Sequence, residues 1–467
     1  MKKKIKICYI GGGSKLWARI FMNDLALSSY IEGEIALYDI DIAAAKRNEA
    51  IGNRISNHKD AKSYWLYKVY ENIDDALRNS DIVLISILPG TFKEMYSDVH
   101  APEEYGVYQS VGDTTGPGGI LRAMRTVPIY EFFAKKIEEI CPSSWVINLT
   151  NPMSICVKTL YDVFPKIKAF GCCHEVFHAQ DLLKDVAKEI LHIDGLSRKD
   201  ITFDVSGINH FTWISDARYK DINLLELLDE FYKNHPQGHF ERGPDDDYLT
   251  NPFSYNNMLK YNLYKRYNVL PAAGDRHLAE FFPNTWFLKS KEDALANGFN
   301  LTSVDLRIAQ QKEKVQNSIA LASGNLEVFI EKSSEEAVEL IESVLGLRES
   351  ISNVNLPNKG QVPYLENGII VESNCVFTKD KVKPIKANDL PSDVKSLIIR
   401  NALNIETCYE GIKNRDFKKI FNSFVNQSLC SSLSLAEARE LFKKMVLNTS
   451  EYLKDYYDLN KILNDEF

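Results

Sequence analysis

The sequence predicts an α/β fold in which an N-terminal dinucleotide domain of Rossmann type precedes a second, mixed α/β domain. Three observations predict it: a glycine turn at residues 11–13, an acid at position 39, and two continuous apolar runs at 80–88 and 143–150. With 467 residues, the chain is also too long for one compact core of ordinary size. We therefore expect a Rossmann-like domain over 1–200 and a second α/β domain over 201–467.

The glycine turn follows directly on IKICYI (5–10), a short β-rich run, and a helical pattern comes after it. Strand, glycine turn and helix together bring bare backbone N–H groups to a pyrophosphate. The complete G-x-G-x-x-G pattern is not present, because Trp17 and Ala18 stand where a further glycine would be expected. The residues that we expect to hold the nucleotide here are Gly11, Gly12, Gly13 and Ser14.

Asp39 gives this motif its context. It ends the second expected strand, EIALYDID (34–41), and lies 26 residues after Gly13. A carboxylate there would accept hydrogen bonds from the ribose hydroxyls and repel a 2′-phosphate, which favours NAD over NADP. The alternative is a doubly wound domain whose turn binds no nucleotide. The agreement in spacing favours bound NAD.

Composition excludes several classes of protein. The net charge is −8 with no long basic cluster, which argues against nucleic acid as a partner. The longest apolar run, 82–88, is too short to span a bilayer. Because Lys6 interrupts the first apolar stretch, the start is not typical of a signal peptide, and we expect a cytoplasmic protein. Eight scattered cysteines are too few for a disulfide framework.

Polar residues follow further expected strands. WVINLT (145–150) leads into Asn151-Pro152. The stretch IKAFGCCHEV (167–176) contains a further expected strand, which ends at the two cysteines, the second of them Cys173. Ligands of open α/β sheets bind at such carboxyl ends. On these residues alone, the asparagines could simply turn the chain, and Cys173 with a distant His210 is only half a metal site.

Six motifs then occur in the order found in glycoside hydrolase family four, which the chain resembles over nearly its whole length. They are GGGS (11–14), VGDTTGPGGILRAMRTVP (111–128), NLTNPMS (148–154), GCCHEV (171–176), GINHFTW (207–213) and VPYLENGIIVE (362–372). The resemblance implies an NAD- and divalent-metal-dependent glycosidase with a fold similar to lactate and malate dehydrogenases. It also implies a homodimer or homotetramer, with 201–467 as the substrate and oligomerisation domain.

The family's chemistry departs from two-carboxylate hydrolysis. The resemblance implies that NAD takes the hydride from C3 of the sugar, which makes the C2 proton acidic. A divalent metal stabilises the charge left when that proton is removed. The leaving group is then eliminated, water adds, and the hydride returns.

The same resemblance implies roles for individual residues. It implies Cys173 and His210 as ligands of a divalent metal, usually Mn²⁺, and His174 as the general acid. For the base at C2 we choose Asp275, with Tyr264 second. The residues implied to contact the bound molecules are Asn148 for the cofactor, and Asn151, Asn209 and Asp113 for the sugar.

The substrate prediction depends on Cys173-His174-Glu175, which resembles the branch that acts on α-linked uronic acids rather than on phospho-sugars. A uronate carboxylate is expected to bind a guanidinium group. Arg276 is our first candidate for this role, and Arg122 and Arg125 are the next candidates. Galacturonide and glucuronide stay open, as do an α-galactosidase or α-glucosidase of the family and an NAD-dependent hydroxy-acid dehydrogenase. The polar loop 233–254 is expected to cover the sugar.

Overall fold

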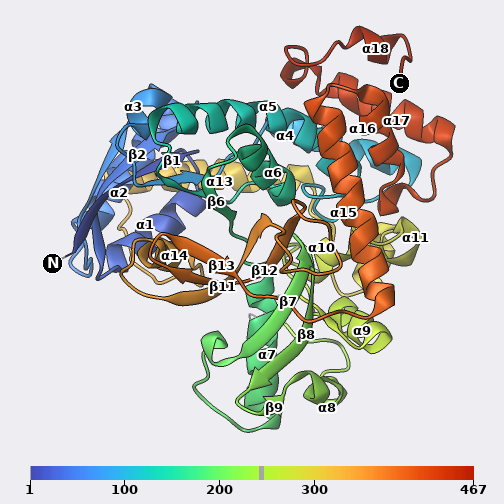
Figure 1. Cartoon of the computed structure of the whole chain (residues 1–467), viewed down its shortest axis with the longest axis horizontal. Coiled ribbons are helices and arrows are strands. Elements are labelled where there is room, and N and C mark those ends of the chain that lie inside the picture. The colour runs from blue at the N-terminus through green and yellow to red at the C-terminus, as the bar shows by residue number, and fades with distance from the viewer. Residues whose placement is uncertain (1, 241–246) are drawn as a thin grey trace.

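The computed structural model describes residues 2–240 and 247–467, and one large sheet runs through it (Figure 1). The sheet has 13 strands, with the main order β10-β8-β7-β12-β11-β6-β5-β4-β1-β2-β3, while β13 pairs with β12 and β9 with β8. The strands are β1 (Lys3–Ile10), β2 (Ile31–Tyr38), β3 (Trp65–Val69), β4 (Ile82–Ile85), β5 (Trp145–Asn148), β6 (Lys168–Gly171), β7 (Thr202–Ile208), β8 (Phe211–Tyr219), β9 (Ile222–Asn223), β10 (Leu270–Pro271), β11 (Ser350–Pro357), β12 (Ile370–Thr378) and β13 (Lys381–Pro384).

The first six strands form a parallel half-sheet in the order β3-β2-β1-β4-β5-β6. This is the strand order of a doubly wound dinucleotide fold. All residues of β4 and β5 are buried, as expected for strands covered on both faces by helices. The predicted α/β fold class is therefore confirmed.

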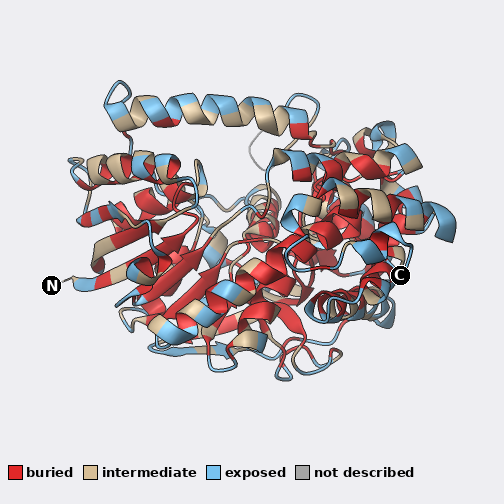
Figure 2. Cartoon of the chain, turned by 90° about the horizontal axis from the view of Figure 1, so that it is seen from above, coloured by how far each residue is buried: buried red, intermediate tan, exposed pale blue. Residues whose placement is uncertain are grey.

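Helices cover the sheet and build the right-hand lobe in Figure 1. They are α1 (Trp17–Leu27), α2 (Ile42–Ser56), α3 (Ile73–Leu77), α4 (Phe92–His100), α5 (Gly116–Ile140), α6 (Met153–Val163), α7 (Glu175–Ile190), α8 (Leu228–Asn234), α9 (Met258–Tyr267), α10 (Asp275–Ala279), α11 (Asn284–Phe287), α12 (Lys291–Ala296), α13 (Val304–Ser323), α14 (Ala337–Val344), α15 (Ser392–Lys413), α16 (Phe417–Val425), α17 (Leu435–Asn448) and α18 (Asn460–Leu463). Figure 2 shows the buried residues concentrated in the strands and on the inner faces of these helices.

The sheet continues without a break into the second half of the chain, where its pairing becomes antiparallel. Strand β11 pairs with β6 through Asn355 and Gly171, and β12 pairs with β7. Strands from 350–378 thus lie between β6 and β7, which flank residues 200 and 201. The division at 200/201 stays a prediction, because the two parts share one sheet.

Two further sequence expectations concern membranes and the polar loop. No helix in the described part of the chain is both long and apolar enough to cross a membrane. Of the loop 233–254, expected to cover the sugar, residues 241–246 lie outside the described residues.

Candidate active site

The glycine turn after β1 is shaped by the protein's own neighbouring strands. Gly11 has φ +93°, and a Cβ on it would lie 1.9 Å from the carbonyl oxygen of Ser86. The N–H groups of Gly11 and Gly12 both donate to Tyr38 O, at 2.9 and 3.0 Å. Glycine is therefore required here by close packing of the turn against β2 and the end of β4, in addition to the approach of a phosphate.

Asp39 is bonded directly to this turn. Its Oδ2 accepts from Gly13 N at 2.8 Å, and its Oδ1 accepts from Asp41 N at 2.8 Å. Asn48 on α2 also supports the turn, because its Nδ2 donates to Gly12 O at 2.7 Å and to Ser14 O at 2.8 Å. Asn48 was missed, since an asparagine inside a helix carries no signal of such a contact.

The turn fits a dinucleotide. Helix α1 begins directly after it, and its N-cap, Leu16, has no side chain that could accept from the first N–H groups. Such N–H groups are available to a pyrophosphate. Ser14 and Asp39 are only partly buried, so both can reach a bound nucleotide.

Asn148 lies at the end of β5 but is fully buried, and its side chain is engaged within the chain. Its Oδ1 accepts from the Tyr130 hydroxyl at 2.5 Å, and its Nδ2 donates to Thr150 O at 3.0 Å and to Met153 Sδ at 2.9 Å. These bonds hold the turn that contains the cis Asn151–Pro152 peptide. The geometry supports a role in ordering this turn rather than in direct contact with the cofactor.

At the opposite side of the site, Thr114 connects Asp113 to His210. Its Oγ1 donates to Asp113 Oδ1 at 2.7 Å and lies 2.9 Å from His210 Nδ1. Because the hydroxyl proton goes to the carboxylate, His210 donates from Nδ1, which leaves a lone pair on Nε2. Burial and the nearby His277 lower the pKa of His210 to about 3, so this imidazole is neutral, as a metal ligand must be.

His277 joins these residues, although the sequence did not single it out. One ligand atom from each of Asp113, His210 and His277 lies within 4.8 Å of the other two. The His277 ring packs against that of His210, with 3.9 Å between centroids and an angle of 35° between the ring planes. Burial raises the pKa of Asp113, but the positive charge of Arg122, with interactions from His277, His210 and the Thr114 hydroxyl, outweighs it and holds that pKa well below its usual range. A carboxylate and two imidazoles are a suitable donor set for a divalent cation.

Cys173 lies between β6 and α7 and is buried. Burial raises the pKa of its thiol well above the usual range, and the charges of Glu372 and Glu175 add to this, while interaction with the Asn209 side chain opposes it. The thiol thus lies beside Asn209, which precedes His210 in the chain. Cys173 is not part of the group formed by Asp113, His210 and His277, and its connection to that group is through Asn209, the neighbour of His210 in the chain.

His174 stands between two carboxylates at the start of α7. Its Nε2 lies 3.7 Å from Glu175 Oε1, and its Nδ1 lies 3.7 Å from Glu335 Oε1. Its ring packs at 5.4 Å from Trp17, the first residue of α1. His174 is therefore placed between the nucleotide turn and the sugar end, where an acid for the leaving group is expected.

Glu175 links His174 to the segment that carries the other candidates. Its Oε2 accepts from Gly274 N at 2.7 Å, and its Oε1 lies 3.7 Å from His277 Nε2. Burial raises the pKa of Glu175, but the surrounding histidines, His277 first, hold it well below its usual range. Sequence reasoning used Glu175 to identify a substrate class and as a neighbour that keeps His174 protonated, but it missed the link to Gly274 and His277.

The predicted sugar-binding asparagines lie at this end of the site. Asn151 Nδ2 donates to Asp113 Oδ2 at 3.3 Å. Asn209 Nδ2 donates to Glu372 Oε2 at 3.1 Å, and burial raises the pKa of Glu372 to about 7. Glu372 belongs to the last of the six motifs, but sequence reasoning assigned it no role.

The two candidate bases differ in position. Asp275 is fully buried, and its carboxylate accepts from Lys260 N at 2.9 Å and from Leu259 N at 3.3 Å, at the start of α9. Tyr264 donates to Leu225 O at 2.8 Å, in packing against a neighbouring helical turn. Asp275 directly precedes Arg276 and His277, so of the two it alone adjoins the site.

The three arginines considered for the uronate carboxylate differ in their hydrogen-bond and ion-pair partners. Arg125 forms an ion pair with Asp98, with Nη1 3.1 Å from Oδ1, and is thereby occupied. Arg122 Nε donates to Asn151 O at 3.1 Å. Arg276 is 8% exposed and donates only to neutral acceptors, Ser110 O and the Thr302 hydroxyl.

Several buried polar atoms at this end have no hydrogen-bond partner within the described part of the chain. They are Asn209 Oδ1, Lys260 Nζ, Arg276 Nε, His277 Nδ1 and Glu280 Oε2. Buried polar groups are normally paired, so each indicates a place where a ligand supplies the partner. A molecule rich in hydroxyl groups, such as a sugar, fits this requirement.

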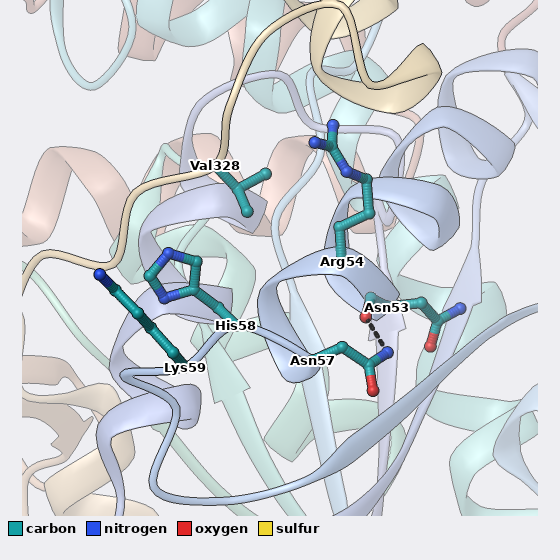
Figure 3. Close-up of a pocket in the computed structure, with 6 residues that line it drawn as sticks. All are labelled: Asn53, Arg54, Asn57, His58, Lys59 and Val328. Atoms are coloured by element: carbon teal, nitrogen blue, oxygen red, sulfur yellow. Dashed lines mark hydrogen bonds between the residues drawn. The ribbon is translucent and has the colours of Figure 1, made fainter.

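A separate hollow of about 500 Å³ lies on the surface of the N-terminal half (Figure 3). It is lined by Asn53, Arg54, Asn57, His58, Lys59 and Val328. Asn57 Nδ2 donates to Asn53 O at 2.7 Å, and Arg54 Nη1 donates to Leu326 O at 3.1 Å. None of the predicted site residues lines it.

Comparison with known proteins shows which family the chain belongs to. The family 4 glycosyl hydrolase model matches residues 6–189, and that of the family's C-terminal domain matches residues 205–430. The α-galacturonidase of Thermoanaerobacterium saccharolyticum is 47% identical over 96% of both chains. That of Thermoanaerobacter italicus is 48% identical over 97% of this chain and 98% of its own.

Solved structures agree in fold. The crystal structure of the Bacillus subtilis protein lplD has a TM-score of 0.89 at 43% identity, covering 95% of this chain and 99% of its own. A 6-phospho-α-glucosidase from gut microorganisms, solved with NAD and Mn²⁺, has a TM-score of 0.80 at 16% identity over 96% and 99%, and so shares the fold. With both family models matched and relatives of this identity over nearly the full length, the chain belongs to the family 4 glycosyl hydrolases.

Proposed function

We propose that this chain hydrolyses α-linked galacturonides, using bound NAD and a divalent cation such as Mn²⁺. The observation that carries the proposal is the meeting of Cys173-His174-Glu175 with Asp113, His210 and His277 at one edge of the sheet. The relatives that are 43–48% identical over nearly the full length are α-galacturonidases, which favours galacturonide over glucuronide.

Both cofactors have suitable residues. The turn at Gly11–Gly13 with Asp39 would hold NAD, and His210 with Cys173 would hold the cation, with Asp113 and His277 beside them. When bound, NAD supplies a hydride acceptor and donor at C3 of the sugar, and the cation stabilises negative charge on the sugar oxygens.

In this proposal, the chain's own side chains bind and orient the sugar. Asn209 Oδ1 and His277 Nδ1 are buried and offer an acceptor and a second nitrogen to sugar hydroxyls. Asn151 and Asp113, which are hydrogen-bonded to each other, orient the ring from the other side. A sugar held on several sides places its C2 and C3 within reach of fixed groups, which lowers the entropic cost of reaction.

Two residues move protons in this proposal. His174, between Glu175 and Glu335, donates a proton to the departing oxygen. Asp275, whose carboxylate is held in place by two backbone N–H groups, removes the proton from C2. The backbone bonds fix the carboxylate's orientation before the sugar arrives.

A panel of p-nitrophenyl glycosides tests the proposed function. We expect cleavage of the α-D-galacturonide, with little activity on the α-D-glucuronide, the α-D-galactoside, the α-D-glucoside and the β-linked sugars. Activity should disappear after treatment with EDTA and removal of nucleotide, and should return only with both NAD and Mn²⁺. Activity that survives both treatments, or steady NADH production from a 2-hydroxy acid, would contradict the proposal.

We further propose a cytoplasmic homodimer or homotetramer. All eight cysteines are free, as in proteins of a reducing compartment. Apolar side chains are exposed on and after α13, with Phe329 73% and Ile319 45% exposed, and a second copy would cover them. Light scattering of the purified protein tests this, and a monomer at micromolar concentration would contradict it.

A further inference from the structure

Two arginines share one aromatic ring beside the sugar end of the site. Arg276 lies on α10 and Arg307 lies in the first turn of α13, and each guanidinium lies 5.3 Å from the centroid of the Phe253 ring. Helices α11 and α12 separate them in the sequence, so the pair exists only in the folded chain. Two neighbouring positive charges repel each other unless a negative group lies close to both.

Among the described residues, no carboxylate forms an ion pair with either arginine, and Asp113 and Glu280 act on both only at longer range. Arg276 donates to Ser110 O at 3.2 Å and to the Thr302 hydroxyl, which are neutral acceptors. Within the described residues, neither Arg276 nor Arg307 forms an ion pair, whereas Arg125 is paired with Asp98. Arg276 and Arg307 therefore differ from an arginine that is held in a structural ion pair, such as Arg125.

Part of each guanidinium group also lacks a hydrogen-bond partner. The Nε atoms of Arg276 and Arg307 are both buried and unpaired among the described atoms. Burial and the charge of Arg276 lower the pKa of Arg307 to about 10, while the Asp113 carboxylate raises it. Because Asp113 acts on both arginines, the pair borders the same space as the sugar. Unpaired buried donors are costly, and an anion at this place removes that cost.

We propose that Arg276 and Arg307 together bind the carboxylate of the uronosyl residue, and that Arg307 decides the preference for an acidic sugar. The inference rests on the proposed function, whose substrate is an α-galacturonide. A planar carboxylate accepts hydrogen bonds from a guanidinium in pairs. A neutral hexoside offers no carboxylate to the unpaired Nε atoms of the two arginines, so the site discriminates against it.

Steady-state kinetics of the loaded enzyme test this assignment. Arg307→Met is compared with the wild type on p-nitrophenyl α-D-galacturonide, its methyl ester and the α-D-galactoside. We expect kcat/KM for the galacturonide to fall about 10- to 100-fold, mainly through KM, because charge-assisted hydrogen bonds are lost. Values for the two neutral sugars should change little, and Arg307→Lys should be intermediate because it keeps the charge without the planar fork.

The matched control is Arg439→Met. Arg439 also lies over aromatic rings, 5.3 Å from Phe421 and 4.6 Å from Phe467, but in the C-terminal helices. It should behave as the wild type on all three substrates. Thermal melting of each variant shows whether Arg307→Met is folded. If it is not, the inference is decided by Arg307→Lys and by the wild type's preference for the free acid over its methyl ester.

Calorimetric titration of the protein with galacturonate, galactose and galactose 6-phosphate separates this inference from the proposed function. The inference predicts binding of galacturonate that weakens about 10- to 100-fold in Arg307→Met, without tight binding of the other two. If the wild type cleaves the galacturonide but Arg307→Met keeps its preference, the inference fails and the function stands. If the wild type does not cleave the galacturonide, the proposed function is wrong. The inference is then decided by whether galacturonate binds the wild type more tightly than Arg307→Met. Stronger binding of the 6-phosphate would overturn the carboxylate assignment.

Discussion

The two ends of the site are built in opposite ways. At the nucleotide turn, the polar groups are bonded to one another: Asp39 accepts from Gly13, and Asn48 donates to Gly12 and Ser14. At the sugar end, Asn209, Arg276 and His277 keep buried polar atoms that have no partner among the described residues. The first arrangement holds its shape without a ligand, whereas the second needs one to satisfy it. The nucleotide end is thus a preformed cradle, and the sugar end discriminates between ligands.

The comparison predicts that damage to the sugar end leaves nucleotide binding intact. The largest effect is expected for His210→Ala, which should lower kcat/KM on p-nitrophenyl α-D-galacturonide at least about 10⁴-fold, because a metal contributes several kcal/mol to stabilising charge. NAD affinity, measured by fluorescence titration, should stay unchanged. A variant that loses NAD binding as well would show that the two ends do not function separately.

Asp275→Asn gives the next largest effect and tests the proposed base. We expect kcat to fall about 10³-fold with a small change in melting temperature, because the amide oxygen still accepts the shorter bond, from Lys260 N, and only the longer bond from Leu259 N is lost. Circular dichroism and kinetics measure the two quantities. A large fall in melting temperature with kcat preserved would instead assign Asp275 to holding the start of α9.

Thr114→Val sharpens the comparison by removing one hydroxyl. Because Thr114 Oγ1 orients His210, we expect Mn²⁺ affinity to fall about 10- to 100-fold, as for other groups that orient a metal ligand. Isothermal titration with Mn²⁺ measures this. Thr407→Val is the control, since its hydroxyl donates only to Leu403 O on α15. Equal Mn²⁺ affinity in both variants would contradict the role given to Thr114.

Asp39→Ala should have the smallest effect on the reaction and should act only at the nucleotide end. We expect the dissociation constant for NAD to rise about tenfold, since one acceptor to the ribose and one bond to Gly13 are lost. At saturating NAD, kcat should be nearly unchanged, and discrimination against NADP should weaken. A loss of kcat at saturation would mean that the turn also positions the reacting groups.

This difference explains how much of the nucleotide end and of the sugar end could be predicted from the sequence. The nucleotide end is local: strand, glycine turn and acid lie within residues 5–39, and the parallel half-sheet places them as expected. Asn48 was the exception, because its bond to the turn depends on how α2 packs. The reason for glycine at position 11 was also incomplete, since the carbonyl of Ser86 excludes a side chain there.

The sugar end depends on segments that only folding brings together. His277 and Arg307 carried no motif, because their importance comes from the position of α10 and α13 beside His210 and Phe253. The insertion of β11 and β12 between β6 and β7 is what places Glu372 against Asn209. Only the resemblance to a known family joined Cys173 to His210, and spacing alone could not have done so.

The account as a whole requires that the sugar end removes a proton from C2 of the substrate. Hydrolysis of the α-galacturonide in D₂O by enzyme loaded with NAD and Mn²⁺ tests this, with NMR of the released galacturonate. We predict deuterium at C2 of the product. Complete turnover with hydrogen retained at C2 would contradict the account.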